Sequence, residues 1–304
     1  MKLIFAGTPA NAALALKLLS REHEIVLVIT REDAVVGRRR ELQPSEVAQE
    51  AARLDLKVLK VNKFDEAVLK EIRAAQADRA IVIAYGALIP SAALELVSWW
   101  NIHFSLLPKW RGASPLQQSM IHNDGIGVTL FEIDAGLDTG PILAQKELKI
   151  PDDESYTSAL ERFTIEGVEL AKQALKNSPT PSSQTGDATY APKISRMDAR
   201  LKFQDTADVI ARKVRAMNPE PIAWTEYQGI QLRIISGRAI GSVDWSQIDG
   251  DNLDIGQVVV SNQRVLVSCG QGTRFELLQV QPAGKKPMSS LDWARGLREE
   301  VRFV

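Results

Sequence analysis

The first half of the chain alternates short apolar runs with amphipathic stretches, and no other feature limits the possible folds as strongly. The runs that predict buried strands are residues 3–6, 25–29, 57–61 and 80–84. The stretches between them that are typical of helices are residues 12–19, 44–54 and 66–75. Nearly continuous apolar strands separated by helices indicate an α/β domain, with a mostly parallel sheet covered by helices on both faces. Sites in such sheets lie at the carboxyl ends of the strands.

The pattern changes after residues 177–186, where proline, serine and threonine crowd together as they do in loops and linkers. An apolar stripe at helical spacing follows over residues 207–217. The next strand-like runs, each bounded by turn residues, are 231–235, 257–260, 264–267 and 274–280. Short strands with regular turns favour a small β-barrel or sandwich. We therefore predict an N-terminal domain over residues 1–184, a linker over 185–205 and a C-terminal domain over 206–304.

Composition narrows the class of protein. A length of 304 residues agrees with two domains, and a net charge of -1 means that nucleic-acid binding would need local basic patches. The single cysteine, Cys269, allows no disulfide within the chain and fits a reducing compartment. The sequence has neither a signal-peptide core nor an apolar run of membrane-spanning length, so we expect a cytoplasmic protein that does not enter membranes. Its three histidines are far apart, and we expect no metal.

The chemically informative segment begins at Asn101 and His103. Residues two apart on a strand project from the same face, and these two precede an irregular segment, so we expect both near a strand's carboxyl end. An amide and an imidazole can both donate to an oxygen that becomes negative when a carbonyl carbon turns tetrahedral. Asp138, in the turn-rich run after residue 135, is the candidate to orient the histidine. Taken alone, such a pair is more often structural, and such an aspartate is more often a turn former.

Residues 101–115 together with 137–140 resemble the signature of the folate-dependent formyltransferases. That pattern is Asn-x-His, Ser-Leu-Leu-Pro, Arg-Gly and then Asp-Thr-Gly or Asp-Ala-Gly. The resemblance implies a Rossmann-like formyltransferase domain followed by an OB-like barrel domain, and 10-formyltetrahydrofolate as formyl donor with no metal. It also implies that Asn101 polarises the formyl carbonyl, that His103 stabilises the oxyanion or moves a proton, and that Asp138 orients His103.

The resemblance further implies which residues lie against the folate. One set is the segment after the Asn-x-His, Ser105, Leu106, Leu107 and Pro108. The other is the loop that binds the pterin, with Tyr85, Gly86, Leu88 and Ile89. Phe104 departs from the family pattern, in which a small residue or proline is common at that position.

Within the family, the chain is most similar to the enzymes that formylate initiator methionyl-tRNA. The runs that carry this likeness are residues 5–9, 37–45 and 110–117. The resemblance implies that a basic loop carrying Arg38, Arg39 and Arg40 enters the acceptor stem, although a charge run by itself is usually a solvated surface. The lysines that we expect to contact tRNA phosphates are Lys193, Lys285 and Lys286. We expect a monomer.

Two alternatives remain at this point. A nucleotide-sugar formyltransferase, acting on a UDP-4-amino-sugar, would share Asn101, His103 and Asp138 but lack the triple-arginine loop. A non-catalytic RNA-binding protein with a barrel domain would bind tRNA without folate and would not need those three residues together.

Overall fold

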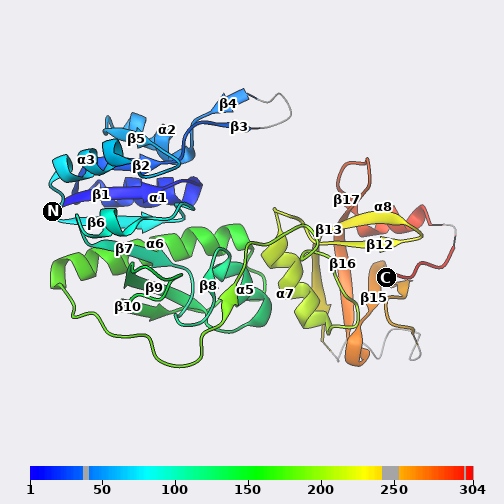
Figure 1. Cartoon of the computed structure of the whole chain (residues 1–304). Coiled ribbons are helices and arrows are strands. Elements are labelled where there is room, and N and C mark those ends of the chain that lie inside the picture. The colour runs from blue at the N-terminus through cyan, green and yellow to red at the C-terminus, as the bar shows by residue number, and fades with distance from the viewer. Residues whose placement is uncertain (37–40, 242–252, 298, 304) are drawn as a thin grey trace. The chain divides into compact units, whose positions relative to one another are not determined.

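The computed structural model describes residues 1–36, 41–241, 253–297 and 299–303. The chain divides into two compact units, which Figure 1 draws with their helices and strands labelled. Unit 1 comprises Met1–Pro115, Gly125–Lys149 and Ala159–Pro192. Unit 2 comprises Leu116–Asp124, Ile150–Ser158 and Lys193–Val304. None of the helices in the described ranges has both the length and the apolar character that crossing a membrane requires.

Unit 1 is built on a seven-stranded sheet with the order β10-β9-β7-β6-β1-β2-β5. The parallel strands are β1 (Lys2–Gly7), β2 (Glu24–Thr30), β5 (Val58–Lys60), β6 (Arg79–Ile83) and β7 (Trp99–His103). The antiparallel strands at one edge are β9 (Gly127–Glu132) and β10 (Ile142–Glu147). The predicted α/β class and mostly parallel sheet are confirmed.

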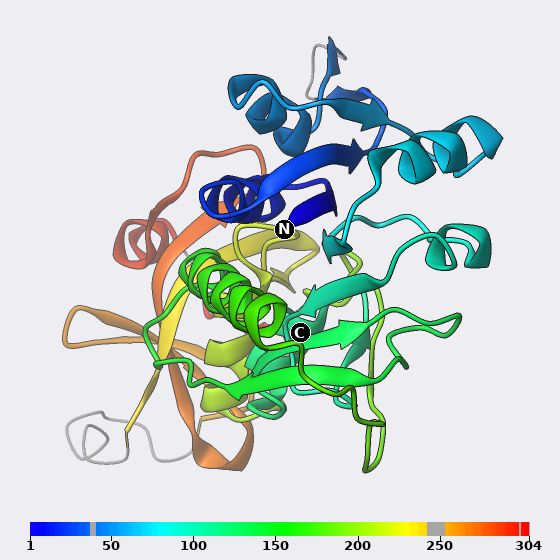
Figure 2. The same cartoon turned by 90° about the vertical axis from the view of Figure 1, so that its left-hand side faces the viewer.

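Helices cover both faces of this sheet. They are α1 (Ala10–Leu19), α2 (Glu46–Arg53), α3 (Glu66–Ala75), α4 (Ser91–Leu94) and α6 (Tyr156–Asn177). Local capping marks two of the starts, because the Ser45 side chain accepts from the N–H of Ala48 and the Asp65 side chain accepts from that of Val68. Figure 2 shows α1 and α6 on one side of the sheet, with α3 and α4 on the other.

Strand β7 has a different neighbour on each face. On one face Trp99 packs in a buried cluster with side chains of α3 and α4, and its Nε1 donates to the Ala93 carbonyl at 2.9 Å. On the opposite face α6 approaches so closely that a Cβ added to Gly167 would lie 2.4 Å from Cγ2 of Ile102. Asn101 and His103 share the face of Trp99, because side chains alternate along a strand. Both faces of β7 are thus fixed by packing.

Unit 2 contains an antiparallel, curled half-barrel sheet with the order β12-β13-β16-β15-β14, and β17 pairs with β16. Its strands are β12 (Trp224–Tyr227), β13 (Ile230–Ile240), β14 (Val258–Ser261), β15 (Arg264–Ser268), β16 (Arg274–Pro282) and β17 (Met288–Ser289). Helices α7 (Ala207–Met217) and α8 (Ser290–Arg295) contribute buried side chains to its core, and α5 (Pro115–His122) joins the two units. The predicted small β domain is confirmed.

Two short pairings complete the fold. β3 (Ala34–Val36) and β4 (Glu41–Gln43) form an antiparallel pair. Between them, the predicted tRNA contacts Arg38, Arg39 and Arg40 lie outside the described residues. β8 (Arg111–Gly112) pairs in parallel with β11 (Tyr190–Ala191), and this pairing brings the end of unit 1 back to the segment that follows β7.

Candidate active site

A cavity of about 730 Å³ opens in unit 1 at the carboxyl ends of β6 and β7. The residues that line it are Val82 of β6, residues 84–89 after β6, residues 101–104 at the end of β7, Gly112, Ala113, Pro115, Phe131 of β9 and residues 133–138. The loop from Ile133 to Pro141, which joins β9 to β10, supplies the last of these walls. The location agrees with the rule that ligands of α/β sheets bind at the carboxyl ends of parallel strands.

Asn101 and His103 reach this cavity from the same face of β7. The backbone of β7 is paired on both sides, Asn101 with Val82 of β6 and with Phe131 of β9, so the position of each side chain is fixed by the sheet. The half-buried Asn101 amide makes no hydrogen bond to any residue that the structure describes. Its NH₂ group is therefore available to a molecule in the cavity.

His103 is a buried imidazole with both nitrogens in defined surroundings. Its side chain is 4% exposed, and Nε2 donates to the Trp110 carbonyl at 2.9 Å. Because a carbonyl only accepts, a neutral ring carries its proton on Nε2 and leaves Nδ1 bare. Nδ1 lies 3.8 Å from Oδ2 of Asp138. The Phe131 ring packs edge-on against the imidazole, with 6.2 Å between centroids.

The protonation of His103 reflects two opposed effects. Burial lowers the pKa of the imidazole, while the Asp138 carboxylate and the hydrogen bond to the Trp110 carbonyl act in the opposite direction, and burial prevails. A ring that is neutral near pH 7 can take up a proton on Nδ1, beside a carboxylate that stabilises the resulting imidazolium. This is the arrangement of a general base rather than of a permanent cation.

Asp138 is brought to His103 by the β9–β10 loop, in an unusual backbone conformation. Its φ is +52°, in the left-handed region, and its Oδ2 accepts the N–H of Gly112 at 2.7 Å. Gly112 has a φ of +123°, and a Cβ there would lie 2.6 Å from the Ala191 carbonyl oxygen. Only glycine fits this position, so the donor to Asp138 depends on the β8–β11 pairing.

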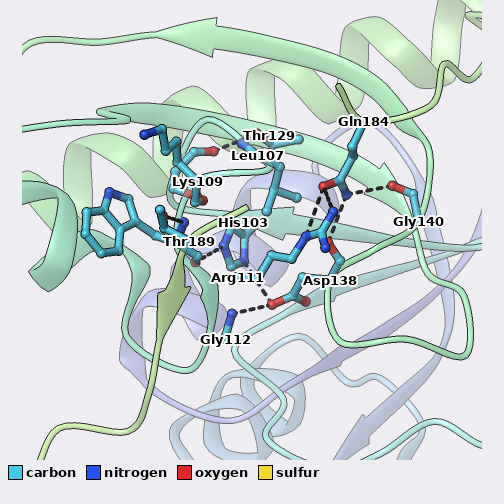
Figure 3. A network of polar contacts seen from close by, with 12 residues as sticks. His103, Leu107, Lys109, Arg111, Gly112, Thr129, Asp138, Gly140, Gln184 and Thr189 are labelled. Atoms are coloured by element: carbon cyan, nitrogen blue, oxygen red, sulfur yellow. Dashed lines mark hydrogen bonds and ion pairs between the residues drawn. The ribbon is translucent and has the colours of Figure 1, made fainter. Parts of the chain in front are cut away.

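Gln184 ties this loop to β8, as Figure 3 shows. Its Oε1 accepts from Nε and Nη2 of Arg111 at 3.2 and 2.7 Å. Its Nε2 donates to the carbonyls of Asp138 and Gly140, each at 2.8 Å. Sequence reasoning missed this residue, because Gln184 stands in a stretch whose composition indicates only a loop and its partners are at least 44 positions away.

The residues predicted to lie against folate fall into two groups. Tyr85, Gly86, Leu88 and Ile89 line the cavity. Ser105, Leu106, Leu107 and Pro108 do not line it; they form the turn after β7 that leads to Trp110. That turn is held by the bond from Ser105 Oγ to the Lys109 carbonyl at 2.6 Å and by the bond from the Leu107 N–H to Thr129 Oγ1 at 3.1 Å. Its visible role is to present the Trp110 carbonyl to His103.

The walls of the cavity are largely apolar. Phe104, at the position where the family pattern differs, lines it and is 7% exposed. Two leucines on the wall, Leu88 and Leu137, are 85% and 62% exposed, so each presents an apolar surface toward the cavity opening and solvent. The volume lies within the roughly 300–1,000 Å³ of small-molecule sites, and the polar lining residues include Asn101 and His103 on one face of β7, with Asp138 beside His103. A flat, partly aromatic ligand with one polar reacting group fits this description.

The lysines predicted to contact tRNA all belong to unit 2. Lys193, Lys285 and Lys286 are exposed, and the latter two lie in the turn between β16 and β17. Exposed lysines at a turn can reach phosphates without rearrangement, and their assignment stays a prediction.

Comparison with known proteins covers both units. Residues 1–175 match the family model for formyl transferases, and residues 193–298 match the model for the formyl transferase C-terminal domain. A methionyl-tRNA formyltransferase of Arthrobacter sp. (strain FB24) is 40% identical over 306 residues, covering 97% of each chain. One of Thermobifida fusca (strain YX) is 40% identical over 309 residues, covering 98% of this chain and 97% of the relative.

Two solved structures share the fold at lower identity. The N-formyltransferase of Helicobacter canadensis, crystallised with folinic acid and dTDP-3-aminofucose, gives a TM-score of 0.67 at 20% identity, covering 93% of this chain and 99% of that one. The methionyl-tRNA formyltransferase of Clostridium thermocellum gives a TM-score of 0.56 at 18% identity, covering 80% and 94%.

Proposed function

Because this chain belongs to the formyl transferase family, we propose that it transfers the formyl group of 10-formyltetrahydrofolate to the amino group of initiator methionyl-tRNA. The product is N-formylmethionyl-tRNA, which serves translation initiation. The observation that carries the proposal is the meeting of Asn101, His103 and Asp138 at one end of a cavity of about 730 Å³. Full-length relatives that are 36–40% identical and share one name support this choice of acceptor.

The cavity would hold the formyl donor. Its apolar wall at Tyr85, Leu88 and Ile89 suits the flat rings of a folate, and Gly86 leaves the backbone of that wall open, since nothing lies within 4 Å of its side-chain position. The polar end with Asn101 and His103 would then receive the formyl group. When bound, the folate supplies the formyl carbon that the amine attacks.

The residues at that polar end perform three tasks. Asn101 donates its amide N–H, which no residue in the described ranges accepts, to the formyl oxygen, which becomes negative as the carbon turns tetrahedral. His103 accepts the proton that the attacking amine loses, at the bare Nδ1, and returns it to the departing N10 nitrogen. Asp138 stabilises the imidazolium between these two steps. The proton that leaves the amine is the one that N10 gains, so no other acid or base is required.

The acceptor would be held by positive charge. We propose that Arg38, Arg39 and Arg40 contact the acceptor stem and that Lys193, Lys285 and Lys286 contact phosphates elsewhere on the tRNA. Each phosphate contact steepens the dependence of tRNA binding on salt. A charged tRNA as acceptor agrees with a cytoplasmic location.

A nucleotide sugar is not favoured as acceptor. The likeness to sugar formyltransferases is one of fold, at 19% and 20% identity, whereas the methionyl-tRNA formyltransferases match at up to 40% over nearly the whole chain.

A comparison of the two candidate acceptors in separate reactions tests the proposal. The purified full chain is incubated with 10-formyltetrahydrofolate and either charged initiator methionyl-tRNA or a UDP-4-amino-sugar, with His103→Ala as the matched inactive control. We expect formylation of the tRNA and none of the sugar nucleotide. A higher kcat/KM for the sugar nucleotide would reverse the assignment, and folate-independent tRNA binding without turnover would favour the non-catalytic alternative.

A further inference from the structure

We propose that Gln184, locked in orientation by Arg111, is a positioning residue that holds Asp138 in place beside His103. The inference rests on the proposed formyl transfer and adds to it a residue that does not touch the reacting atoms. It concerns the network drawn in Figure 3, in which three segments far apart in the chain converge on the β9–β10 loop.

The side-chain amide of Gln184 is fully used. Its oxygen faces the guanidinium of Arg111, which can only donate, and its nitrogen faces the carbonyls of Asp138 and Gly140, which can only accept. No flipped orientation satisfies these partners. Arg111 therefore decides which way the amide points, and the amide decides where the Asp138 carbonyl lies.

Asp138 needs such support because of its backbone. A φ of +52° is disfavoured for a residue with a Cβ and persists only where the surroundings impose it. Gln184 holds the carbonyl of Asp138, while the N–H of Gly112 holds its carboxylate at 2.7 Å. Because Arg111 and Gly112 are consecutive in β8, the same short strand fixes Asp138 at two points, once through Gln184 and once directly.

In this arrangement the Asp138 carboxylate faces His103, with 3.8 Å between Oδ2 and Nδ1. Arg111 is a cation of this network, and its guanidinium donates to the neutral amide of Gln184. A glutamate in place of Gln184 would keep the bonds from Arg111 on one carboxylate oxygen, but it would place the other oxygen, which cannot donate, where Nε2 now donates to the carbonyls of Asp138 and Gly140. Gln184→Glu therefore removes the support for the loop with almost no change in size.

The test is a double-mutant cycle between Gln184→Ala and Asp138→Ala, with kcat and both KM values measured on initiator methionyl-tRNA and 10-formyltetrahydrofolate. We expect Gln184→Ala and Gln184→Glu to lower kcat roughly 10- to 100-fold, since small misplacements of reacting groups have effects of this size, and to change each KM less than about two-fold. In the Asp138→Ala background the same substitutions should lower kcat by less than about two-fold, because there is no longer a carboxylate to position.

Asn218→Asp is the matched control for lost amide bonds. The Asn218 nitrogen donates to the carbonyls of Val214, Ile234 and Ile235 in unit 2, at 2.9, 3.1 and 2.9 Å, and the substitution makes the same amide-to-acid change. We expect a lower Tm for this variant and, at temperatures well below that Tm, a kcat within about two-fold of wild type.

A second readout does not depend on turnover. The pKa of His103, followed by NMR of the imidazole, should fall in Gln184→Ala in the same direction as in Asp138→Ala, because the carboxylate would no longer be held near Nδ1. Should Gln184→Ala fold poorly, Gln184→Glu provides the same kinetic comparison in the double-mutant cycle.

The outcomes separate the two proposals. Equal fold-losses for Gln184→Ala with and without Asp138, or an unchanged His103 pKa in Gln184→Ala, would overturn the positioning role. If His103→Ala and Asp138→Ala themselves formylate methionyl-tRNA at the wild-type rate, the proposed catalytic machinery fails instead, whatever Gln184 does.

Discussion

The two units each hold a carboxylate with little exposure, and they hold it in opposite ways. In unit 1, Asp138 accepts a neutral backbone N–H from Gly112 and faces His103 at 3.8 Å. In unit 2, Glu276 is clamped between Arg238 Nε at 2.8 Å and Arg264 Nη2 at 2.9 Å. One carboxylate thus lies beside a titratable ring, and the other lies between two permanent cations.

This difference indicates that Asp138 serves the reaction and that Glu276 serves the stability of the fold. Burial by itself raises the pKa of Glu276, but the hydrogen bonds and charges of Arg264 and Arg238 bring that pKa below its usual value. Its charge is then balanced within the fold at all physiological pH values. Asp138 instead faces His103, and burial lowers the pKa of that imidazole. The carboxylate therefore stabilises positive charge on the ring only when the ring takes up a proton.

The largest expected effect is on turnover in unit 1. His103→Ala and Asn101→Ala should each lower kcat on initiator methionyl-tRNA by roughly 10² to 10⁴, because each removes a group that acts on the reacting carbon or its proton. Their melting temperatures should stay close to that of the wild type. Turnover near the wild-type rate in either variant would mean that this side chain has no part in the mechanism. The contrast between a catalytic site in unit 1 and a purely stabilising carboxylate in unit 2 would then fail.

Gly112→Ala should damage both the fold and the reaction. The added Cβ would meet the Ala191 carbonyl oxygen at 2.6 Å at a φ of +123°, so the donor to Asp138 must move. We expect a loss of unfolding free energy of roughly 1–3 kcal/mol, together with a fall in kcat. Gly229→Ala is the control, because it shares a positive φ of +74° but has nothing within 4 Å of the new Cβ. Denaturant melts of both variants measure the loss of unfolding free energy. A kcat equal to wild type in Gly112→Ala would contradict the prediction.

Glu276→Gln should act on stability alone. It leaves Arg238 and Arg264 without their counter-charge, and we expect the unfolding free energy to fall by about 1–3 kcal/mol while kcat at 25 °C stays unchanged. The control is Glu71→Gln, which removes an exposed ion pair with Lys57 and should leave the melting curve unaltered.

The Glu276 contribution has a defined pH window. Since the folded pKa of Glu276 lies below its unfolded value of about 4.3, the stabilisation is fully present above that value and is lost as the pH falls through the folded pKa. Wild type and Glu276→Gln should therefore converge in stability in acid. A difference that persists unchanged down to strongly acidic pH would mean that the clamp does not act through charge.

The smallest effect concerns His103 and the pH dependence of stability. Its folded pKa lies below its unfolded value of about 6.5, so as the pH falls below that value the unfolded chain takes up the proton first and wild type loses stability. His103→Gln should lose less over the same range, by at most about 1.4 kcal/mol per pH unit. Parallel curves of Tm against pH for the two proteins would show that the imidazole titrates normally in the fold.

Much of unit 1 could be predicted because its signals are local. The four predicted strands correspond to β1, β2, β5 and β6, and the predicted strand end at His103 is where β7 ends. The two antiparallel strands, β9 and the edge strand β10, are not among the predicted strands. No crossover helix connects them, and in β10 only Leu143 is buried while Gln145–Glu147 are polar and exposed, so β10 has no continuous apolar run. The tRNA-contacting role of Arg38–Arg40 lies outside the described residues and stays a prediction.

The amino-acid sequence by itself determined the alternation of strands and helices and the common face of Asn101 and His103, because a period of two along a strand is a property of neighbouring residues. Only the tertiary structure decided how Asp138 is held beside His103, with Gly112 donating to its carboxylate across 26 positions and Gln184 donating to its carbonyl across 46. Those contacts depend on how the β9–β10 loop and the segment after α6 fold back over the sheet. No local pattern records that path, since each hydrogen bond forms only after the strands have brought distant carbonyls and N–H groups together.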